Sequence, residues 1–330
     1  MSNPAIAFVT GGYSSEAVIS YKSAITIEKH IDPSRYNVFR IDITPDKWFH
    51  TTKGGEEFIV NKDDFSLTIG GNKICFDAVF IGIHGTPGED GKLQGYFDLL
   101  NIPYTSCDAT ASAITFNKRY TVAIAGTAGF HVAQSIHLFK ENHQERKAQL
   151  QKLKYPVFVK PNNGGSSIGM SKLSSPEGLD EALEKAFKED DQVLVEEFIS
   201  GREFTIGVYK SNGKIITLPF TEVMSQNDFF DFEAKYQGKS TEVTPAVCTE
   251  DIAHKVRNAA AGIYAVFNCR GVVRMDFIYN EQLQEPFLLE INTVPGQSDA
   301  SIVPQQVAAA GMTLREFYAM LIDDALKSKQ

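Results

Sequence analysis

The sequence has 330 residues, of which 43% are hydrophobic and 22% charged, and its formal net charge is −9. This length exceeds one ordinary core, so two or three packed units are expected, and the negative charge argues against nucleic acid as a partner. There is no apolar run of about eighteen residues, which argues against a membrane-spanning helix. The first residues lead straight into a strand pattern without a basic start, so we expect no signal peptide and a cytoplasmic protein.

The first third of the chain alternates strand and helix patterns. Short apolar, β-branched runs occur at residues 6–10, 36–43 and 76–85, and residues 15–30 carry helical spacing. Strand–helix–strand order at this spacing predicts parallel strands joined by helical crossovers.

The middle of the chain has a different character. One helix is expected over residues 112–129, followed by a polar, helix-forming stretch at 140–152. Strand patterns at 155–161 and 192–200 then flank a Gly/Ser loop and a helix near 176–190. This order predicts a small α+β unit of antiparallel strands with two helices.

The last third is rich in strands and ends in a helix at roughly 312–327. Strand patterns are read at 204–210, 214–220, 271–279 and 286–292. Before the last two strands, residues 223–246 have no clean period and are rich in charged and aromatic residues. Loops of this length inside a compact domain are usually functional lids or disordered, and the aromatic content favours a lid that orders over a substrate.

Oxygen-bearing side chains interrupt two of these apolar strands. Asp276 lies in the middle of one, and Glu290 and Asn292 lie two residues apart on one face of the next. If the strands pair, the three side chains converge into a set of hard ligands that suits Mg²⁺ or Mn²⁺ bridging ATP phosphates. The alternative is three unrelated polar residues at strand edges. However, Asp and Glu are rarely buried in such runs without a partner or a metal.

These two strands, with the segments RMDF and LLEINTVPG, resemble the metal-binding signature of the ATP-grasp fold as found in D-alanine–D-alanine ligases. Other segments match that family in its own order: GGYSSE (11–16), HGTPGEDGKLQG (84–95), VKPNNGGSSIGMSK (159–172), VEEFISGREFT (195–205) and FEAKY (232–236). The resemblance covers almost the whole chain. Six short motifs in the correct order make a chance likeness very improbable.

The resemblance implies an α/β (α+β) fold of the ATP-grasp type in three parts. Residues 1–106 would form an N-terminal parallel α/β domain that binds substrate. Residues 107–205 would form the small central α+β subdomain. Residues 206–330 would form the C-terminal α+β domain for metal and substrate, with the lid at about 223–246.

The glycine-rich segment 159–172 reads as a strand that delivers Lys160, followed by a flexible loop. Lys160 can meet ATP phosphates as a point charge, and the glycines let backbone N–H groups approach phosphate oxygens. Alone, this run would more often be a hairpin turn, and the P-loop pattern is absent. In the family pattern, Lys118 is a second phosphate-binding lysine, residues 196–199 read adenine through backbone groups, and Glu203 holds the ribose. The implied ATP site comprises Lys118, Lys160, Ser166, Ser167, Glu196, Glu197, Ile199 and Glu203.

The candidate substrate residues come from several segments. Glu16 follows a glycine turn at the carboxyl end of a strand, where open α/β sheets place ligands. The resemblance implies that Glu16 holds the ammonium group of the first D-alanine, although an acid there would also complement a helix dipole. His84 ends another strand and is assigned to the substrate pocket, whereas Glu89 and Asp90 are expected to shape their loop.

The remaining roles rest on the resemblance. Tyr236 on the lid would hydrogen-bond with Ser166 and Glu16, and Lys235 would reach the γ-phosphate. Arg274 would stabilise charge on the transferring phosphoryl group. Gly296 would offer a backbone N–H to the oxyanion. Ser301 would bind the carboxylate of the second substrate, and Ile302 would line its pocket.

The family's reaction joins two D-alanines through a D-alanyl phosphate, using ATP and two Mg²⁺ or Mn²⁺ ions, for peptidoglycan precursor synthesis; the family also suggests a homodimer. Three alternatives remain open: a ligase with D-lactate or D-serine as second substrate, an L-amino-acid ligase, and a non-catalytic nucleotide-binding regulator. The FEAKY lid favours the dipeptide-forming branch. A Rossmann dehydrogenase is disfavoured because G-x-G-x-x-G does not follow the first strand.

Three departures from the family pattern stand out. Gly164 occupies a position that is often acidic, and Asn117 occupies one where an acid is common, which we interpret as a surface or capping change. After NTVPG the family commonly reads Met-Thr-x-His-Ser, whereas this chain reads Gln-Ser-Asp-Ala-Ser at 297–301. The second substrate site therefore departs from the family pattern just before Ser301.

Overall fold

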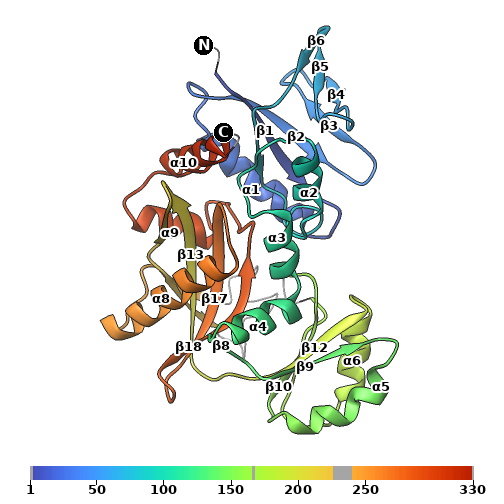
Figure 1. Ribbon diagram of the computed structural model, residues 1–330, viewed down its shortest axis with the longest axis vertical. Coiled ribbons are helices and arrows are strands. Elements are labelled where there is room, and N and C mark those ends of the chain that lie inside the picture. The colour runs from blue at the N-terminus through green and yellow to red at the C-terminus, as the bar shows by residue number, and fades with distance from the viewer. Residues whose placement is uncertain (1–2, 166–167, 226–239, 329–330) are drawn as a thin grey trace.

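The described part of the chain forms three main β-sheets (Figure 1). The computed structural model describes residues 3–165, 168–225 and 240–328. The sheets have five, four and seven strands, and a small hairpin of β5 (Leu67–Ile69) and β6 (Asn72–Ile74) adjoins the first.

The first sheet has the strand order β4-β3-β2-β1-β7. Its strands are β1 (Ala5–Gly11), β2 (Asn37–Ile43), β3 (Trp48–Thr51), β4 (Glu57–Ile59) and β7 (Ala78–Ile81). β1 pairs in parallel with β2 and β7, and α1 (Ala17–His30) crosses between β1 and β2, so the predicted parallel strands are confirmed. The antiparallel strands β3 and β4 were not predicted. The helix α2 (Lys92–Leu99) follows β7.

The second sheet is fully antiparallel, in the order β11-β10-β12-β9. Its strands are β9 (Ser135–Phe139), β10 (Val157–Pro161), β11 (Ser171–Leu173) and β12 (Gln192–Glu197). Two helical segments accompany it, namely α6 (Leu179–Phe187) and α5 (His143–Arg146) running into the 3₁₀ helix η1 (Lys147–Lys152). The small α+β unit of antiparallel strands and two helices is therefore confirmed.

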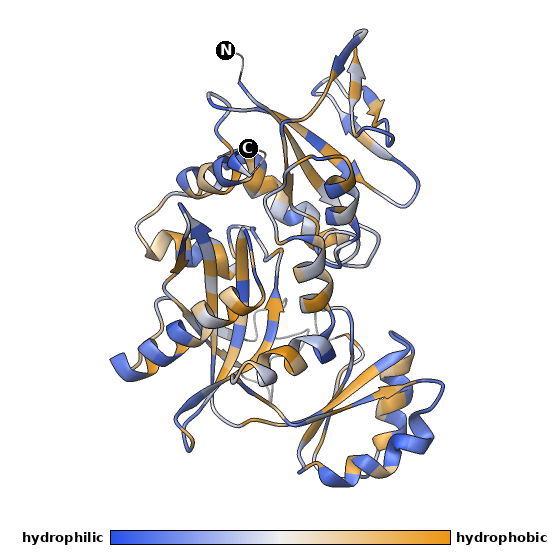
Figure 2. Cartoon of the chain, in the orientation of Figure 1, coloured by the Kyte–Doolittle hydropathy of each residue, from blue (hydrophilic) through white to orange (hydrophobic). Residues whose placement is uncertain are grey.

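The third sheet runs β16-β15-β13-β17-β18-β8, with β14 also paired to β13. Its strands are β8 (His131–Val132), β13 (Arg202–Ser211), β14 (Lys214–Thr217), β15 (Thr221–Ser225), β16 (Ser240–Val243), β17 (Val272–Asn280) and β18 (Glu285–Asn292). The helices around it are α3 (Ala109–Phe116), α4 (Lys118–Thr127), α8 (Glu250–Val266) and α9 (Ile302–Ala309). Figure 2 shows hydrophobic residues concentrated on the strands and hydrophilic residues along α5 and much of α8.

The single helix predicted at 112–129 is wrong, because the chain breaks at Asn117 into α3 and α4. Asn117 has φ −93° and ψ 104°, outside the helical region, and its side chain accepts a 3.1 Å hydrogen bond from Tyr120 N. Asn117 is thus the N-cap of α4. It is a buried residue, so the capping interpretation holds and the surface interpretation does not.

The lid predicted at 223–246 is partly strand. β15 and β16 pair antiparallel with Ser225 opposite Ser240, so the loop prediction is wrong at both ends. Residues 226–239, with Lys235 and Tyr236, lie outside the described residues.

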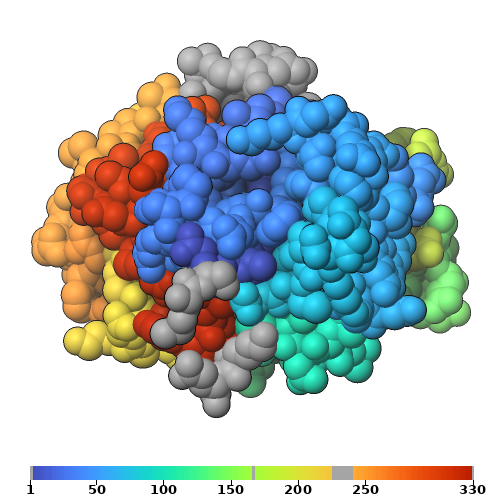
Figure 3. Space-filling view, turned by 90° about the horizontal axis from the view of Figure 1, so that it is seen from above, coloured from blue at the N-terminus to red at the C-terminus, as the bar shows by residue number. Residues whose placement is uncertain are grey.

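The helix α10 (Leu314–Lys327) returns to the first sheet, where its residues Phe317 and Tyr318 pack in one core with Ile6 and Phe8 of β1. Figure 3, seen from above, shows this end of the chain in red beside the blue N-terminal residues. Both aromatic side chains are fully buried, which contributes about 2–3 kcal/mol each. A capping box between Thr313 and Glu316 starts the helix.

Core membership crosses the proposed boundaries at 106 and 205. Ala111 of α3 and Ala125 of α4 pack in the core of the third sheet, together with Val256 of α8. The division at 1–106, 107–205 and 206–330 remains a proposal. Across the described ranges, no helix is long and apolar enough to cross a membrane.

Candidate active site

Two adjoining cavities lie where the three sheets meet. The larger, of about 650 Å³, is walled by the second and third sheets, and the smaller, of about 390 Å³, by the third sheet and the N-terminal part. Residues from all three parts line both cavities: Glu16, Lys118, Gly164, Gly165, Asp276 and Glu290. The acids, the lysine and the glycine loop therefore mark the junction between the two spaces.

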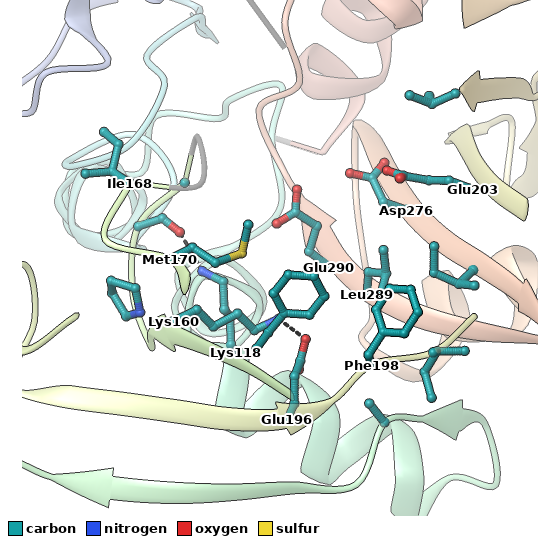
Figure 4. Close-up of a pocket in the computed structure, with 18 of the residues that line it drawn as sticks. Lys118, Lys160, Ile168, Met170, Glu196, Phe198, Glu203, Asp276, Leu289 and Glu290 are labelled. Atoms are coloured by element: carbon teal, nitrogen blue, oxygen red, sulfur yellow. Dashed lines mark hydrogen bonds and ion pairs between the residues drawn. The ribbon is translucent and has the colours of Figure 1, made fainter. Parts of the chain in front are cut away.

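The predicted ATP residues gather around the larger cavity. Its lining includes Lys118, Lys160, Glu196, Glu197, Ile199 and Glu203; Ser166 and Ser167 lie outside the described residues. Lys118 Nζ donates a 2.6 Å hydrogen bond to the Gly164 carbonyl. Lys160 forms an ion pair with Glu196, and both side chains are largely buried. Figure 4 shows the two lysines on one side of this space and the carboxylates of Asp276, Glu203 and Glu290 on another.

Apolar residues complete the larger cavity; their side chains were not predicted as part of it, although Phe198 lies in the segment 196–199 that was assigned to adenine. They include Phe158, Met170, Phe198, Ile278 and Leu289. The rings of Phe158 and Phe198 have centroids 5.9 Å apart, which makes a wall suited to a flat base. In the sequence Phe158 resembles a core residue. However, side chains alternate along β10, so Val157 and Val159 enter the core while Phe158 and Lys160 face the cavity.

Arg274, Asp276 and Glu290 form one charged cluster at the junction. In the antiparallel pair β17–β18, Asp276 lies opposite Glu290 and Arg274 opposite Asn292, so the predicted strand pairing is confirmed. Arg274 donates to both Asp276 oxygens, at 3.0 and 2.8 Å, and to Glu290 Oε1 at 3.3 Å. Thr205 Oγ1 donates to Asp276 Oδ1 at 2.6 Å. Burial raises the pKa of Asp276, while Arg274 opposes that shift.

The donor chemistry of this cluster fits a hard divalent cation. Asp276 and Glu290 supply carboxylate oxygens, and Asn292 supplies an amide oxygen that also accepts from Val294 N at 3.0 Å. Among the described residues, His, Cys, Asp and Glu side chains form no three-membered metal-ligand group. Asp276, Glu290 and Asn292 would hold such a cation through hard oxygen ligands, the kind that Mg²⁺ prefers.

The smaller cavity holds most of the predicted substrate residues. Its lining includes Glu16, His84, Arg274, Asn292, Gly296, Ser301 and Ile302. The Glu16 carboxylate is enclosed by two glycines. A Cβ atom would lie 2.4 Å from Glu16 Oε2 if built on Gly85, and 2.7 Å from Oε1 if built on Gly165. Glycine at both positions therefore lets the glycine loop of the second part approach an N-terminal carboxylate. The proposed contacts of Tyr236 and Ser166 with Glu16 involve residues outside the described ranges.

Two buried titratable groups lie at the same cavity. Burial lowers the pKa of His84 to about 4; the backbone of Val294 raises this pKa by a smaller amount, and Arg274 lowers it further. The imidazole is therefore neutral near pH 7. Glu89 accepts a 2.6 Å hydrogen bond from Gly85 N, in line with the loop-shaping role expected for it. Burial and the neighbouring Glu16 raise the pKa of Glu89 to about 8, so Glu89 retains a proton at neutral pH.

The loop after β18 brings Gly296 and Ser301 together. A Cβ atom on Gly296 would lie 2.8 Å from Ser301 Oγ. Ser301 is the N-cap residue of α9, and its hydroxyl contacts Ser298 Oγ at 2.7 Å. The backbone of Gly296 and the start of α9 therefore face the same small space.

Comparisons with known proteins agree over nearly the whole chain. The family models described as "D-ala D-ala ligase N-terminus" and "D-ala D-ala ligase C-terminus" match residues 5–107 and 124–323. The D-alanine–D-alanine ligase of Flavobacterium johnsoniae is 43% identical over 97% of this chain and 99% of that protein. The ligase of Parabacteroides distasonis is also 43% identical, over 98% of each.

Solved structures show the same fold. The VanG D-Ala:D-Ser ligase of Enterococcus faecalis superposes with a TM-score of 0.89 at 30% identity, covering 98% of this chain and 99% of that one. A D-alanine–D-alanine ligase of Bacillus anthracis complexed with ATP has a TM-score of 0.77 at 25% identity, covering 99% and 98%. The predicted fold is thereby confirmed, and this chain belongs to the D-alanine–D-alanine ligase family of ATP-grasp enzymes.

Proposed function

We propose that this enzyme joins two D-alanine molecules into D-alanyl-D-alanine with ATP, for peptidoglycan precursor synthesis. The observation that carries this assignment is the junction of the two cavities. A nucleotide-sized space meets an amino-acid-sized space at Glu16, Lys118, Asp276 and Glu290. A phosphoryl group passing from one space to the other would cross this junction.

ATP would occupy the larger cavity. Its apolar wall at Phe158 and Phe198 suits adenine, Glu203 is assigned to the ribose, and Lys118 and Lys160 to the phosphates. The backbone N–H groups of Glu197 and Phe198 donate to Gln134 O and Pro156 O, each at 2.9 Å. Adenine recognition by residues 196–199 would therefore depend mainly on their other backbone groups.

Asp276, Glu290 and Asn292 would hold Mg²⁺ or Mn²⁺, two ions in the family pattern. When bound, these ions neutralise charge on the phosphates. The hard oxygen donors of the three side chains support this assignment. We expect Asp276→Asn to raise the Mg²⁺ concentration at half-maximal rate by at least about tenfold. An unchanged requirement would remove Asp276 from the metal site.

The first step forms an acyl phosphate. A carboxylate oxygen of the first D-alanine attacks the γ-phosphorus, the bond to the bridging oxygen breaks, and ADP leaves. Glu16 would hold the ammonium group of that substrate. Arg274 would stabilise the charge on the phosphoryl oxygens, and its place between Asp276 and Glu290 supports that role.

The second step forms the peptide bond. The neutral amine of the second D-alanine attacks the acyl carbon, the C–O bond to phosphate breaks, and the proton lost by the nitrogen leaves with the phosphate. Gly296 would donate a backbone N–H to the oxyanion, Ser301 would bind the second carboxylate, and Ile302 would line the pocket. His84 would line the substrate space as a neutral side chain. Catalysis would depend on positioning and charge stabilisation, so no nucleophilic residue is required.

Residues of the proposed lid would close the site. Lys235 would reach the γ-phosphate, and Tyr236 would hydrogen-bond with Ser166 and Glu16. An acyl phosphate is readily hydrolysed, so excluding water would favour transfer to the amine. Ser167 would add a hydroxyl to the phosphate loop.

The cellular setting is also a proposal. The four free cysteines and the use of ATP support a cytoplasmic enzyme. Val18 and Ile25, seven residues apart on one face of α1, are 61% and 69% exposed, which supports a homodimer through α1. Light scattering on the purified protein would test the dimer, and a monomeric mass would contradict it.

The function is tested by ADP release with ATP, Mg²⁺ and D-alanine, compared with L-alanine, D-serine and D-lactate in place of D-alanine. We expect that, of the four compounds, only D-alanine supports turnover and that the product is D-alanyl-D-alanine. If D-alanine does not stimulate ADP release, the proposed reaction is wrong.

D-alanine–D-serine ligation is a second candidate. The likeness to the VanG ligase favours it. Mass spectrometry of products from equimolar D-alanine and D-serine would decide between them. Predominance of the mixed dipeptide would favour the second candidate.

A further inference from the structure

The loop that carries Gly296 and Ser301 is attached to helix α1. This helix begins directly after Glu16, its N-cap residue, and the buried side chains of Ser23 and Thr26 lie about two and three turns further on. Both of these side chains contact the loop 294–301. The same helix thus carries Glu16, the proposed ligand of the first substrate, at its start and holds the loop of the second substrate further along.

The main contact passes through the Ser23 hydroxyl. Gln297 N donates to Ser23 Oγ at 3.1 Å, and Ser23 Oγ lies 2.9 Å from His84 Nε2. The Ser23 hydroxyl therefore accepts from Gln297 N and also pairs with His84 Nε2. Removing this hydroxyl would leave two buried groups unpaired.

The Gln297 side chain makes a second attachment. It is 5% exposed, its Oε1 accepts from the Tyr318 hydroxyl of α10 at 3.1 Å, and its Nε2 donates to Pro295 O at 3.2 Å. Methionine, common at this position in the family pattern, has no N–H to donate to Pro295 O and offers only a weakly accepting sulfur to Tyr318. The departure in this loop is therefore matched by contacts within the protein.

Asp299 makes a third attachment. Thr26 Oγ1 donates to Asp299 Oδ1 at 3.0 Å, and Thr26 is buried. This contact lies on the same face of α1, three residues beyond Ser23. The loop is thus held at two positions along α1 and once by α10.

We propose that Ser23, Gln297 and Thr26 are positioning residues that set the second-substrate loop relative to the first-substrate site. The inference rests on the proposed roles of Gly296 and Ser301. None of the three residues lines either cavity, so they act through the loop. Loosening the loop would weaken binding of the second substrate and relax its selectivity, while ATP and the first D-alanine would bind as before.

The test compares Ser23→Ala with Ser112→Ala. Ser112 is also a fully buried helix serine, but it bonds to Cys107 O and does not contact the loop. We expect Ser23→Ala to raise the KM for the acceptor D-alanine about tenfold. With equimolar D-alanine and D-serine, it should also increase the proportion of D-alanyl-D-serine among the products. The KM for ATP should change less than about twofold. The rate of positional isotope exchange in ATP, which requires only the first D-alanine, should also change less than about twofold.

Three outcomes would overturn the proposal: an acceptor KM that changes no more than in Ser112→Ala, a KM for ATP that rises in step with it, or an unchanged product ratio. If Ser23→Ala does not fold, Gln297→Met and Thr26→Val apply the same criteria, because both conserve volume and keep the backbone N–H groups. Failure of the ligase assignment itself would be distinct, because the wild-type enzyme would then release no ADP with D-alanine.

Discussion

Lys160 of β10 and Glu196 of β12 form a buried ion pair in the wall of the larger cavity, with side chains 12% and 8% exposed. The two residues lie on neighbouring antiparallel strands. A buried charge that loses its partner is destabilising, so this lysine has a structural role besides the phosphate contact proposed for it.

The double role of Lys160 can be separated by mutation. We expect Lys160→Met to raise the KM for ATP at least about tenfold and to lower the free energy of unfolding by about 3 kcal/mol, because Glu196 is left unpaired. Adding Glu196→Gln should restore much of the stability but not the KM. Lys188→Met, at an exposed position outside both cavities, is the control. Recovery of both properties in the double variant would contradict the phosphate role.

Asn162 lies between the two proposed phosphate-binding lysines. It follows Lys160 by two residues in the sequence and hydrogen-bonds to the start of α4, where Lys118 lies. Its fully buried side chain accepts from Arg119 N at 2.9 Å, at the start of α4, while its backbone carbonyl accepts from Lys118 N. We expect Asn162→Ala to cost about 1–3 kcal/mol of unfolding free energy, because a buried N–H loses its acceptor. The KM for ATP should rise several-fold because Lys118 shifts. Chemical denaturation and initial-rate kinetics would measure both, with exposed Asn258→Ala as control. A loss of stability without a change in KM would show that Asn162 does not position Lys118.

Glu89 makes the stability of the protein depend on pH. Its pKa is raised to about 8 in the folded chain by burial and Glu16, so the folded state holds a proton that the unfolded chain loses above about pH 4.5. The stabilisation is complete below that pH and is lost as pH rises towards 8. We expect the unfolding free energy to fall less between pH 5 and about 8.5 in Glu89→Gln than in the wild type. An equal fall of the unfolding free energy with pH in the two proteins would contradict the raised pKa of Glu89.

The only tryptophan of the sequence, Trp48, contacts the segment 11–16 that carries Glu16. Trp48 Nε1 donates to the Tyr13 hydroxyl at 2.8 Å, and Tyr13 is three residues from Glu16. Because indole emission depends on its hydrogen bonding and surroundings, we expect binding of D-alanine with ATP to change the fluorescence of Trp48. Tyr13→Phe should reduce that change while preserving the fold. Titration of both proteins measures it, and an equal response in the two would exclude the Tyr13 contact as its origin.

Residue types alone were enough to predict part of the site. Asp276 and Glu290 interrupt apolar strands, and such acids need a partner, so their convergence was expected before the pairing of β17 and β18 was observed. Phe158 could not be recognised in the same way, because an apolar residue facing a cavity has the same alternation as one facing a core. Phe198 was included only through the family resemblance, as part of the segment 196–199. The break at Asn117 was missed because the sequence on both sides is helix-forming.

The sequence by itself determined the family, the parallel strands of the first sheet and the residues that could bind metal and phosphate, because these depend on local patterns and side-chain chemistry. Only the tertiary structure decided how the chain closes around the site. Residues 23, 84, 297 and 318 meet around one loop, and α10 returns to the first sheet. Contacts between residues so far apart depend on the packing of whole elements, and no local period in the sequence records that packing.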